Sequence, residues 1–266
     1  NFVKCLIPQV DGLYVCGSYG SGPLMVPSQR MLVAEAVLDE VAGRIPVIIH
    51  VGMPDTRSTL ELAKHAELLG ADAVACLTPY YYRHEPRLIS EHFRRVIEGV
   101  SVPVFLYNNP KYTNYCITAD QLAQLADWGL GGLKDSSGNI TLFYECVAKV
   151  RNNGFVFLTG SQTMLLPALV GGGHGCVSGL SNLFPKFVKE IYEKVIEGDL
   201  VSALKLQRRA NELRRLTGAG IPIPFYHAAL KFRGIDIGFP KAPLLPLSPG
   251  EEEVVGRIMK EFSDLE

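Results

Sequence analysis

Short runs of apolar residues recur along the chain, and longer segments of mixed polarity separate them. The runs do not alternate strictly with polar residues, which indicates strands buried on both faces, as in a parallel sheet covered by helices. Each run is short enough to form a single strand. We expect strands within residues 11–17, 45–52, 71–79, 102–108, 131–136, 155–161 and 174–180.

The segments between these runs carry apolar residues at helical spacing, and several begin after a Ser, Thr or Asp that can cap a helix. We expect helices within residues 28–41, 56–69, 86–99, 118–126, 140–150 and 163–170. Strands and helices therefore alternate along the chain. Repeated units of this kind favour an α/β fold, the (β/α)8 or TIM barrel.

Both ends of the chain depart from a simple barrel. Residues 1–10 resemble the end of a helix, so we expect that the first barrel strand is absent from this sequence. After the seventh run, helical spacing continues through 185–197, 200–216, 223–232 and 249–262, which is more than one closing helix. We therefore expect a barrel over residues 1–198 that lacks its first unit, and a C-terminal helical extension over residues 199–266.

Composition narrows the class of partner. The formal net charge is −1, which gives no electrostatic basis for binding nucleic acid, and no run approaches the ~20 apolar residues of a membrane span. We expect a cytoplasmic protein. The six cysteines form no CxxC pair and the six histidines show no metal-ligand spacing, so we expect no metal site.

One lysine ends an apolar run, in the stretch GGLKDSSGN at 131–139. Catalytic groups of such barrels collect where strands end and loops begin. A lysine inside a barrel loses hydration, which lowers its pKa and makes the free amine a nucleophile toward carbonyl groups. Lys134 is therefore the candidate nucleophile, and an imine formed there would make an organic cofactor unnecessary. The alternative is that Lys134 only caps the strand or pairs with Asp135.

A tyrosine ends another apolar run and is followed by a turn-forming Asn-Asn-Pro. A phenol with a pKa near ~10 is a weak base, but an adjacent iminium cation and a hydroxyl relay would ease its deprotonation. Tyr107 is the candidate for proton transfer, and Ser18 could provide the relay. The alternative for Tyr107 is a half-buried aromatic side chain at the barrel rim.

The glycine-rich segment GSYGSG at 17–22 fits neither dinucleotide nor P-loop spacing. Its backbone N–H groups, together with Ser18, Tyr19 and Gly20, could instead hold a carboxylate, because anions suit a concave arrangement of amide donors. The alternative is a tight turn that leads into the next helix.

Taken in order, five segments resemble the dihydrodipicolinate synthase and N-acetylneuraminate lyase family of class I pyruvate aldolases. They are GSYGSGP, TPYYY, YNNP, GLKDSSGN and GFPKAPLLPL. The resemblance covers nearly the whole chain and implies a barrel with a C-terminal helical extension. It also implies that Lys134 forms the imine, that Tyr107 transfers protons and that Ser18 belongs to the loop that binds the keto-acid carboxylate. Tyr81 matches a tyrosine segment that crosses an oligomer interface in many members, which are usually dimers of dimers.

Some positions depart from the family pattern. Tyr19 stands where a second Thr is usual, and Tyr112, after Lys111, stands where the synthases carry an arginine for the far carboxylate. In phosphate-accepting sugar-acid enzymes a second tyrosine occupies the place of Asn109. These departures weigh against a role in lysine biosynthesis. They leave both phosphorylated and unphosphorylated substrates as alternatives.

The motifs resemble those of 2-keto-3-deoxygluconate aldolases more than those of the dihydrodipicolinate synthases. We therefore expect a Schiff-base aldolase that reversibly cleaves a 2-keto-3-deoxy sugar acid to pyruvate and an aldehyde, with Gly160 and Ser178 shaping the polyhydroxyl end of the pocket. Dihydrodipicolinate synthesis and 4-hydroxy-2-oxoglutarate cleavage are the enzyme alternatives. A catalytically impaired barrel that binds metabolites is the non-enzyme alternative.

Overall fold

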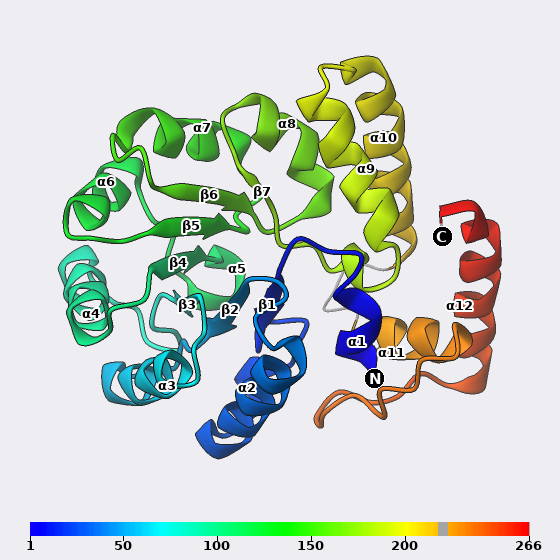
Figure 1. Cartoon of the computed structure of the whole chain (residues 1–266), viewed down its shortest axis with the longest axis horizontal. Coiled ribbons are helices and arrows are strands. Elements are labelled where there is room, and N and C mark those ends of the chain that lie inside the picture. Colours follow the sequence, from blue (N-terminus) through cyan, green and yellow to red (C-terminus); the bar gives the residue numbers. More distant parts are fainter. Residues whose placement is uncertain (218–222, 266) are drawn as a thin grey trace.

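The protein forms a curled, seven-stranded parallel sheet with helices around its outside (Figure 1). The structure is a computed structural model, and it describes residues 1–217 and 223–265. The strands pair in chain order, so each strand lies beside the next one in the sequence. They are β1 (Leu13–Val15), β2 (Val47–His50), β3 (Ala73–Leu77), β4 (Val104–Asn108), β5 (Gly132–Asp135), β6 (Val156–Thr159) and β7 (Gly175–Cys176).

A helix follows each strand, and further helices after the one that follows β7 extend the C-terminal part. The α-helices are α1 (Phe2–Leu6), α2 (Pro27–Val41), α3 (Thr56–Leu68), α4 (Pro86–Gly99), α5 (Pro110–Thr113), α6 (Ala119–Asp127), α7 (Ile140–Lys149), α8 (Leu165–Val170), α9 (Pro185–Ile196), α10 (Leu200–Leu216), α11 (Ile223–Phe232) and α12 (Pro249–Glu261). Short 3-10 turns lie at η1 (Gly22–Leu24), η2 (Gln162–Met164), η3 (Leu180–Asn182) and η4 (Ser263–Leu265).

The predicted alternation of strands and helices is confirmed, and the curled sheet agrees with a (β/α)8 barrel-like fold. Every predicted strand is present but shorter, and the run at 174–180 contributes only two residues to the sheet. The four-residue helix α5 was not predicted. The absence of a first strand stays a prediction.

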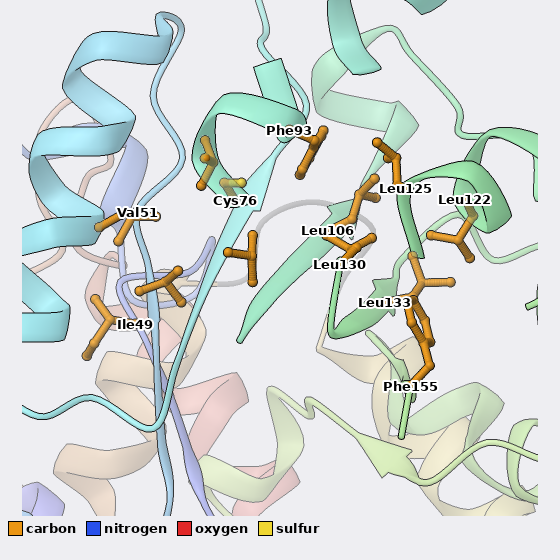
Figure 2. Close-up of a cluster of buried hydrophobic side chains, with 14 of the residues drawn as sticks. Ile49, Val51, Cys76, Phe93, Leu106, Leu122, Leu125, Leu130, Leu133 and Phe155 are labelled. Carbon is orange, nitrogen blue, oxygen red and sulfur yellow. The ribbon is translucent and has the colours of Figure 1, made fainter. Parts of the chain in front are cut away.

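Side chains alternate between the two faces of the sheet. The outer face packs against the helices in a large apolar core, and Figure 2 shows side chains of this core from four successive strands, among them Ile49, Cys76, Leu106 and Leu133. The inner face carries a smaller cluster around Ala73, Ala75 and Phe105. Residues on this inner face that lie near the C-terminal ends of the strands therefore point into the barrel mouth.

The last helices share a second apolar core. It joins α9, α10, α11 and α12, and includes Phe184, Phe187, Leu213 and Met259. In Figure 1 these helices stand at one side of the barrel, and Phe2 of α1 packs against their shared core. The predicted extension, 199–266, includes residues 218–222 and 266, which lie outside the described residues, and its boundary with the barrel stays a prediction.

Candidate active site

Lys134 points into the barrel mouth from β5. It pairs in register with Tyr107 of β4, so the two side chains come from neighbouring strands and face the same way. The Lys134 nitrogen Nζ lies 3.8 Å from the ring centre of Tyr107 and 3.8 Å from that of Tyr14. Two aromatic faces therefore enclose the amine, an arrangement in which the rings attract its cationic form.

The ammonium form of this lysine is poorly hydrated. Lys134 is 5% exposed, and burial lowers its pKa, although the Tyr107 hydroxyl acts in the opposite direction. The neighbouring Asp135 faces the other side of the strand, where its carboxylate accepts hydrogen bonds from Asn108 at 2.6 Å and from the Ser137 hydroxyl at 2.8 Å. The alternative in which Lys134 pairs with Asp135 is not the arrangement found.

The Tyr107 hydroxyl lies in a network of polar groups. It is 3.3 Å from the Ser18 hydroxyl and accepts a hydrogen bond of 3.0 Å from Asn109 Nδ2. Burial raises the pKa of Tyr107, but the positive charge of Lys134 and hydrogen bonds with Ser18, Ser136 and Asn109 outweigh it, so the net pKa is lowered. A phenol with a lowered pKa is a better general base near neutral pH.

The loop after β1 brings Ser18 to this network by folding back on itself. Cys16 has a positive φ of 58°, and the Gly22 amide donates to the Gly17 carbonyl at 3.1 Å. A Cβ at Gly22 would lie 1.8 Å from the Cys16 carbonyl oxygen, so this turn requires glycine there. Within the described residues, the Ser18 amide has no backbone or side-chain acceptor, which leaves a donor at the mouth for an anion.

Tyr19 takes a different direction from Ser18. Its ring is 37% exposed and packs edge-on against Tyr226 of α11, with 5.1 Å between ring centres. A Cβ at Gly179 would lie 2.7 Å from the Tyr19 ring. The side chain therefore joins the loop to the C-terminal helices.

The remaining predicted residues surround the mouth at different distances. Gly20 lies on the turn, where a Cβ would be 3.3 Å from the Cys16 amide, and Gly160 packs against the Ser136 hydroxyl, which a Cβ would approach to 1.8 Å. Ser178 donates to Gln162 at 3.3 Å. Tyr81 is 81% exposed with a positive φ of 83°, so it lies on the surface and outside the barrel interior.

Four residues of the site were not among the predicted candidates. Tyr14 and His50 point inward from β1 and β2 and surround Lys134 and Tyr107, and Asn109 and Ser136 contact the Tyr107 hydroxyl. The position of Ser136 two residues after Lys134 was a usable signal. His50 is the last residue of β2, so a polar side chain near the end of an apolar run was a signal for it too, whereas Tyr14 gave none, because it lies in the middle of a short apolar run.

The described part of the chain shows neither a metal-binding cluster nor a membrane-spanning helix. Across residues 1–217 and 223–265, no three His, Cys, Asp or Glu side chains gather where they could hold a metal ion. Over the same ranges, none of the helices combines the length and apolar character that crossing a bilayer requires.

Comparison with known proteins gives a consistent family. Residues 2–262 match the dihydrodipicolinate synthetase family. The chain is 39% identical over 236 residues to an uncharacterized DapA-like lyase of Halobacterium salinarum, covering 88% of this chain and 77% of that protein. It is 32% identical over 253 residues to a 4-hydroxy-tetrahydrodipicolinate synthase of Anaeromyxobacter, covering 95% and 86%.

Solved structures agree with this assignment. Dihydrodipicolinate synthase from Aquifex aeolicus superposes with a TM-score of 0.93 at 27% identity, covering 99% of this chain and 90% of that one. YagE, a family member from Escherichia coli K12 in complex with pyruvate, gives a TM-score of 0.93 at 25% identity, covering 98% and 90%. The chain therefore belongs to the dihydrodipicolinate synthetase family of class I pyruvate-dependent aldolases and lyases, which work through a covalent lysine–pyruvate Schiff base and need no added cofactor.

Proposed function

We propose that this lyase reversibly cleaves a 2-keto-3-deoxy sugar acid, such as 2-keto-3-deoxygluconate, to pyruvate and an aldehyde. Lys134 is the nucleophile, Tyr107 the general acid and base, and Ser18 the hydroxyl that orients carboxylate and proton. One observation carries the proposal: a buried amine lies 3.8 Å from the ring of a tyrosine whose hydroxyl is 3.3 Å from a loop serine.

The chemistry follows from this placement. The neutral Lys134 amine attacks the keto carbon, and the Tyr107 hydroxyl gives its proton to the departing hydroxyl group, so that loss of water leaves an iminium ion and the Tyr107 phenolate. The bond between C3 and C4 then breaks, its electron pair passes into the enamine, and the Tyr107 phenolate takes the proton of the C4 hydroxyl as the aldehyde leaves. Protonation of the enamine at C3 and hydrolysis of the imine release pyruvate and restore the free amine.

The loop after β1 supplies the carboxylate site. The Ser18 amide and hydroxyl stand at the mouth beside Tyr107, and a Cβ at Gly17 would lie 4.0 Å from Lys134 Nζ, so the loop begins close to the reacting amine. Tyr19 and Gly20 contribute backbone donors rather than a second hydroxyl. Gly160 and Ser178 shape the far end of the pocket, where the hydroxyl groups of the substrate would lie.

The main competing substrate is aspartate semialdehyde. Relatives named 4-hydroxy-tetrahydrodipicolinate synthase, such as the one from Anaeromyxobacter, favour this alternative. Tyr112, in the place of the arginine expected for the far carboxylate of that reaction, weighs against it, because a phenol lacks the bidentate cationic donors of a guanidinium. Cleavage of 4-hydroxy-2-oxoglutarate is the third candidate.

Borohydride trapping tests the imine. Incubation with pyruvate and borohydride, followed by intact mass and peptide mapping, should place a reduced pyruvyl adduct on Lys134. Lys134→Ala should abolish the adduct, whereas Lys64→Ala on α3 should leave it unchanged. Failure of the unaltered protein to form any adduct, or trapping at another lysine, contradicts the proposed mechanism.

Product analysis then tests the substrate. The protein is supplied with pyruvate and, in separate reactions, glyceraldehyde, aspartate semialdehyde or glyoxylate. The proposal expects the highest kcat/KM with glyceraldehyde. A clear preference for aspartate semialdehyde or glyoxylate would assign one of the two alternative reactions while leaving the imine mechanism intact.

We also expect a homo-oligomer, built as a dimer of dimers. Family members are oligomeric, and Tyr81 supports an interface here because it is an exposed aromatic side chain packed edge-on against Tyr82, which is itself 70% exposed. Its left-handed backbone is strained for a tyrosine. Sedimentation of the unaltered protein and of Tyr81→Ala tests the assembly, and a monomer at micromolar concentration for both would contradict it.

A further inference from the structure

The side chain of His50 joins three neighbouring strands at the barrel mouth. It is 1% exposed, and its ring lies edge-on to Tyr107, with 5.7 Å between ring centres. Nδ1 is 3.2 Å from the Cys16 carbonyl oxygen at the end of β1, and Nε2 is 3.3 Å from the Leu77 amide at the end of β3. The imidazole therefore spans from one neighbour of β2 to the other.

The partners of the ring determine its tautomer. A backbone amide can only donate, so Nε2 must accept from Leu77 and carry no proton. The proton is then on Nδ1, which donates to the Cys16 carbonyl. Arg30 Nη2 lies 3.1 Å from Nδ1, but both are donors, and its hydrogen bond goes to the His50 carbonyl.

The chain makes room for this bridge. A Cβ at Gly52 would lie 2.7 Å from the Leu77 amide nitrogen and 3.1 Å from His50 Nε2, so any larger residue would interrupt the bond. The Gly52 carbonyl is turned toward Arg30, which donates to it at 2.8 Å. Arg30 is 2% exposed, and among the described residues no carboxylate lies within ion-pair distance of it.

The ring is held neutral by its surroundings. Burial, the charge of Arg30 and the charge of Lys134 all lower its pKa well below the ordinary value. Protonation at Nε2 would also place two donors against each other at Leu77. An imidazole that cannot take a proton is unsuited to general base catalysis. Its contribution to the site is therefore its two hydrogen bonds.

We propose, on the basis of the proposed function, that His50 is a positioning residue that holds the Ser18 loop in register with Tyr107 through the Cys16 carbonyl. Cys16 adopts the left-handed backbone conformation immediately before Gly17 and Ser18. The Nδ1–H bond fixes the carbonyl that begins this loop, and the loop carries the hydroxyl that lies 3.3 Å from the Tyr107 hydroxyl.

Two variants separate the two ends of the imidazole. The amide of His50→Asn can take the place of Nδ1 and keep the bond to Cys16, whereas the longer His50→Gln reaches toward Leu77 and loses it. We expect His50→Gln to lower kcat by about 10- to 100-fold, as for a misplaced catalytic group, and to shift the pH profile of kcat, while His50→Asn stays within about threefold of the unaltered protein. Equal kcat values and pH profiles for the two variants would overturn the proposal.

A matched control and an independent readout complete the test. His65→Leu on α3, where His65 contacts Glu35, should leave kcat unchanged. Nitrogen NMR of histidine-labelled protein, with the His50 signal assigned by its loss in His50→Asn, should show an Nδ1–H ring that is still neutral at the pH where an ordinary imidazole is half protonated, about 6.5. An Nε2–H tautomer or a protonated ring overturns the inference even if Lys134 traps pyruvate, whereas absent trapping with the expected tautomer rejects only the proposed function.

Discussion

Lys134 and Tyr107 modify each other across neighbouring strands. Their side chains are partners in register, with the lysine nitrogen 3.8 Å from the centre of the phenol ring. Burial lowers the pKa of the amine, and the charge on that amine helps to lower the pKa of the phenol. The contact itself therefore favours the ammonium together with the phenolate, whereas burial favours the free amine that attacks the substrate.

Removing the phenol should separate these two effects. Tyr107→Phe keeps the ring but loses the proton-transfer group, so kcat should fall about 10²- to 10⁴-fold. The Tyr107 hydroxyl raises the pKa of Lys134, so its loss should lower that pKa further. The acid limb of the pH profile for borohydride trapping should therefore move to lower pH, and a shift to higher pH would contradict this account.

The activity should depend on the hydroxyl group of Ser18 more than on the size of the side chain. Ser18→Ala removes the group that lies 3.3 Å from the Tyr107 hydroxyl, and we expect kcat to fall about 10-fold or more. Ser18→Thr retains a hydroxyl and should keep most of the activity. Steady-state kinetics on both variants measures the difference, and similar losses for the two would show that the hydroxyl is not the important feature.

Gly132 should tolerate no side chain. A Cβ there would lie 2.2 Å from the ring of Phe105, which fills the barrel interior on the adjacent strand. Gly132→Ala should therefore destabilise the protein by about 1–3 kcal/mol through overpacking. Gly250→Ala is the matched control, since a Cβ there meets open space. Thermal unfolding of both should show a lower midpoint for Gly132→Ala alone.

Stability should fall as the pH drops through the range of buried histidines. Burial lowers the pKa of His92, which is 3% exposed, from 6.5 to about 4. Below about pH 6.5 the unfolded chain takes up a proton that folded His92 refuses, so the free energy of unfolding falls until about pH 4, by about 3 kcal/mol for this residue. His50 contributes in the same direction.

Urea unfolding at a series of pH values measures this dependence. The slope of unfolding free energy against pH between 6.5 and 4 should be smaller in His92→Asn than in the unaltered protein. The unaltered protein provides the comparison at each pH, so any constant destabilisation by the substitution cancels. Identical slopes would show that His92 does not titrate differently on folding.

The order of strands and helices could be read from the sequence because buried parallel strands leave a strong local signal. The run at 131–136 around Lys134 was short and lay between two segments of helical spacing, and it forms β5. The helix α5 (Pro110–Thr113) could not be predicted, because four residues are too few to show helical periodicity. Strand ends were overestimated because apolar residues continue past the hydrogen-bonded ladder.

Only part of the candidate site could be predicted from the sequence. Lys134, Tyr107 and Ser18 end strands or begin loops, so the barrel topology brings them together. The direction of Tyr19 could not be predicted, because it depends on contact with Tyr226 in the last part of the chain. The role of His50 depends on the two strands beside it, and neither is near it in sequence.

The contact between Tyr19 and Tyr226 also bears on when the protein becomes active during its synthesis. The strands that carry Lys134 and Tyr107 leave the ribosome well before α11. A nascent chain that has not reached Tyr226 already contains both residues of the reactive pair, yet it lacks the ring against which Tyr19 of the Ser18 loop packs. Contacts between distant parts of a chain form late in folding, so completion of the carboxylate site should follow completion of the chain.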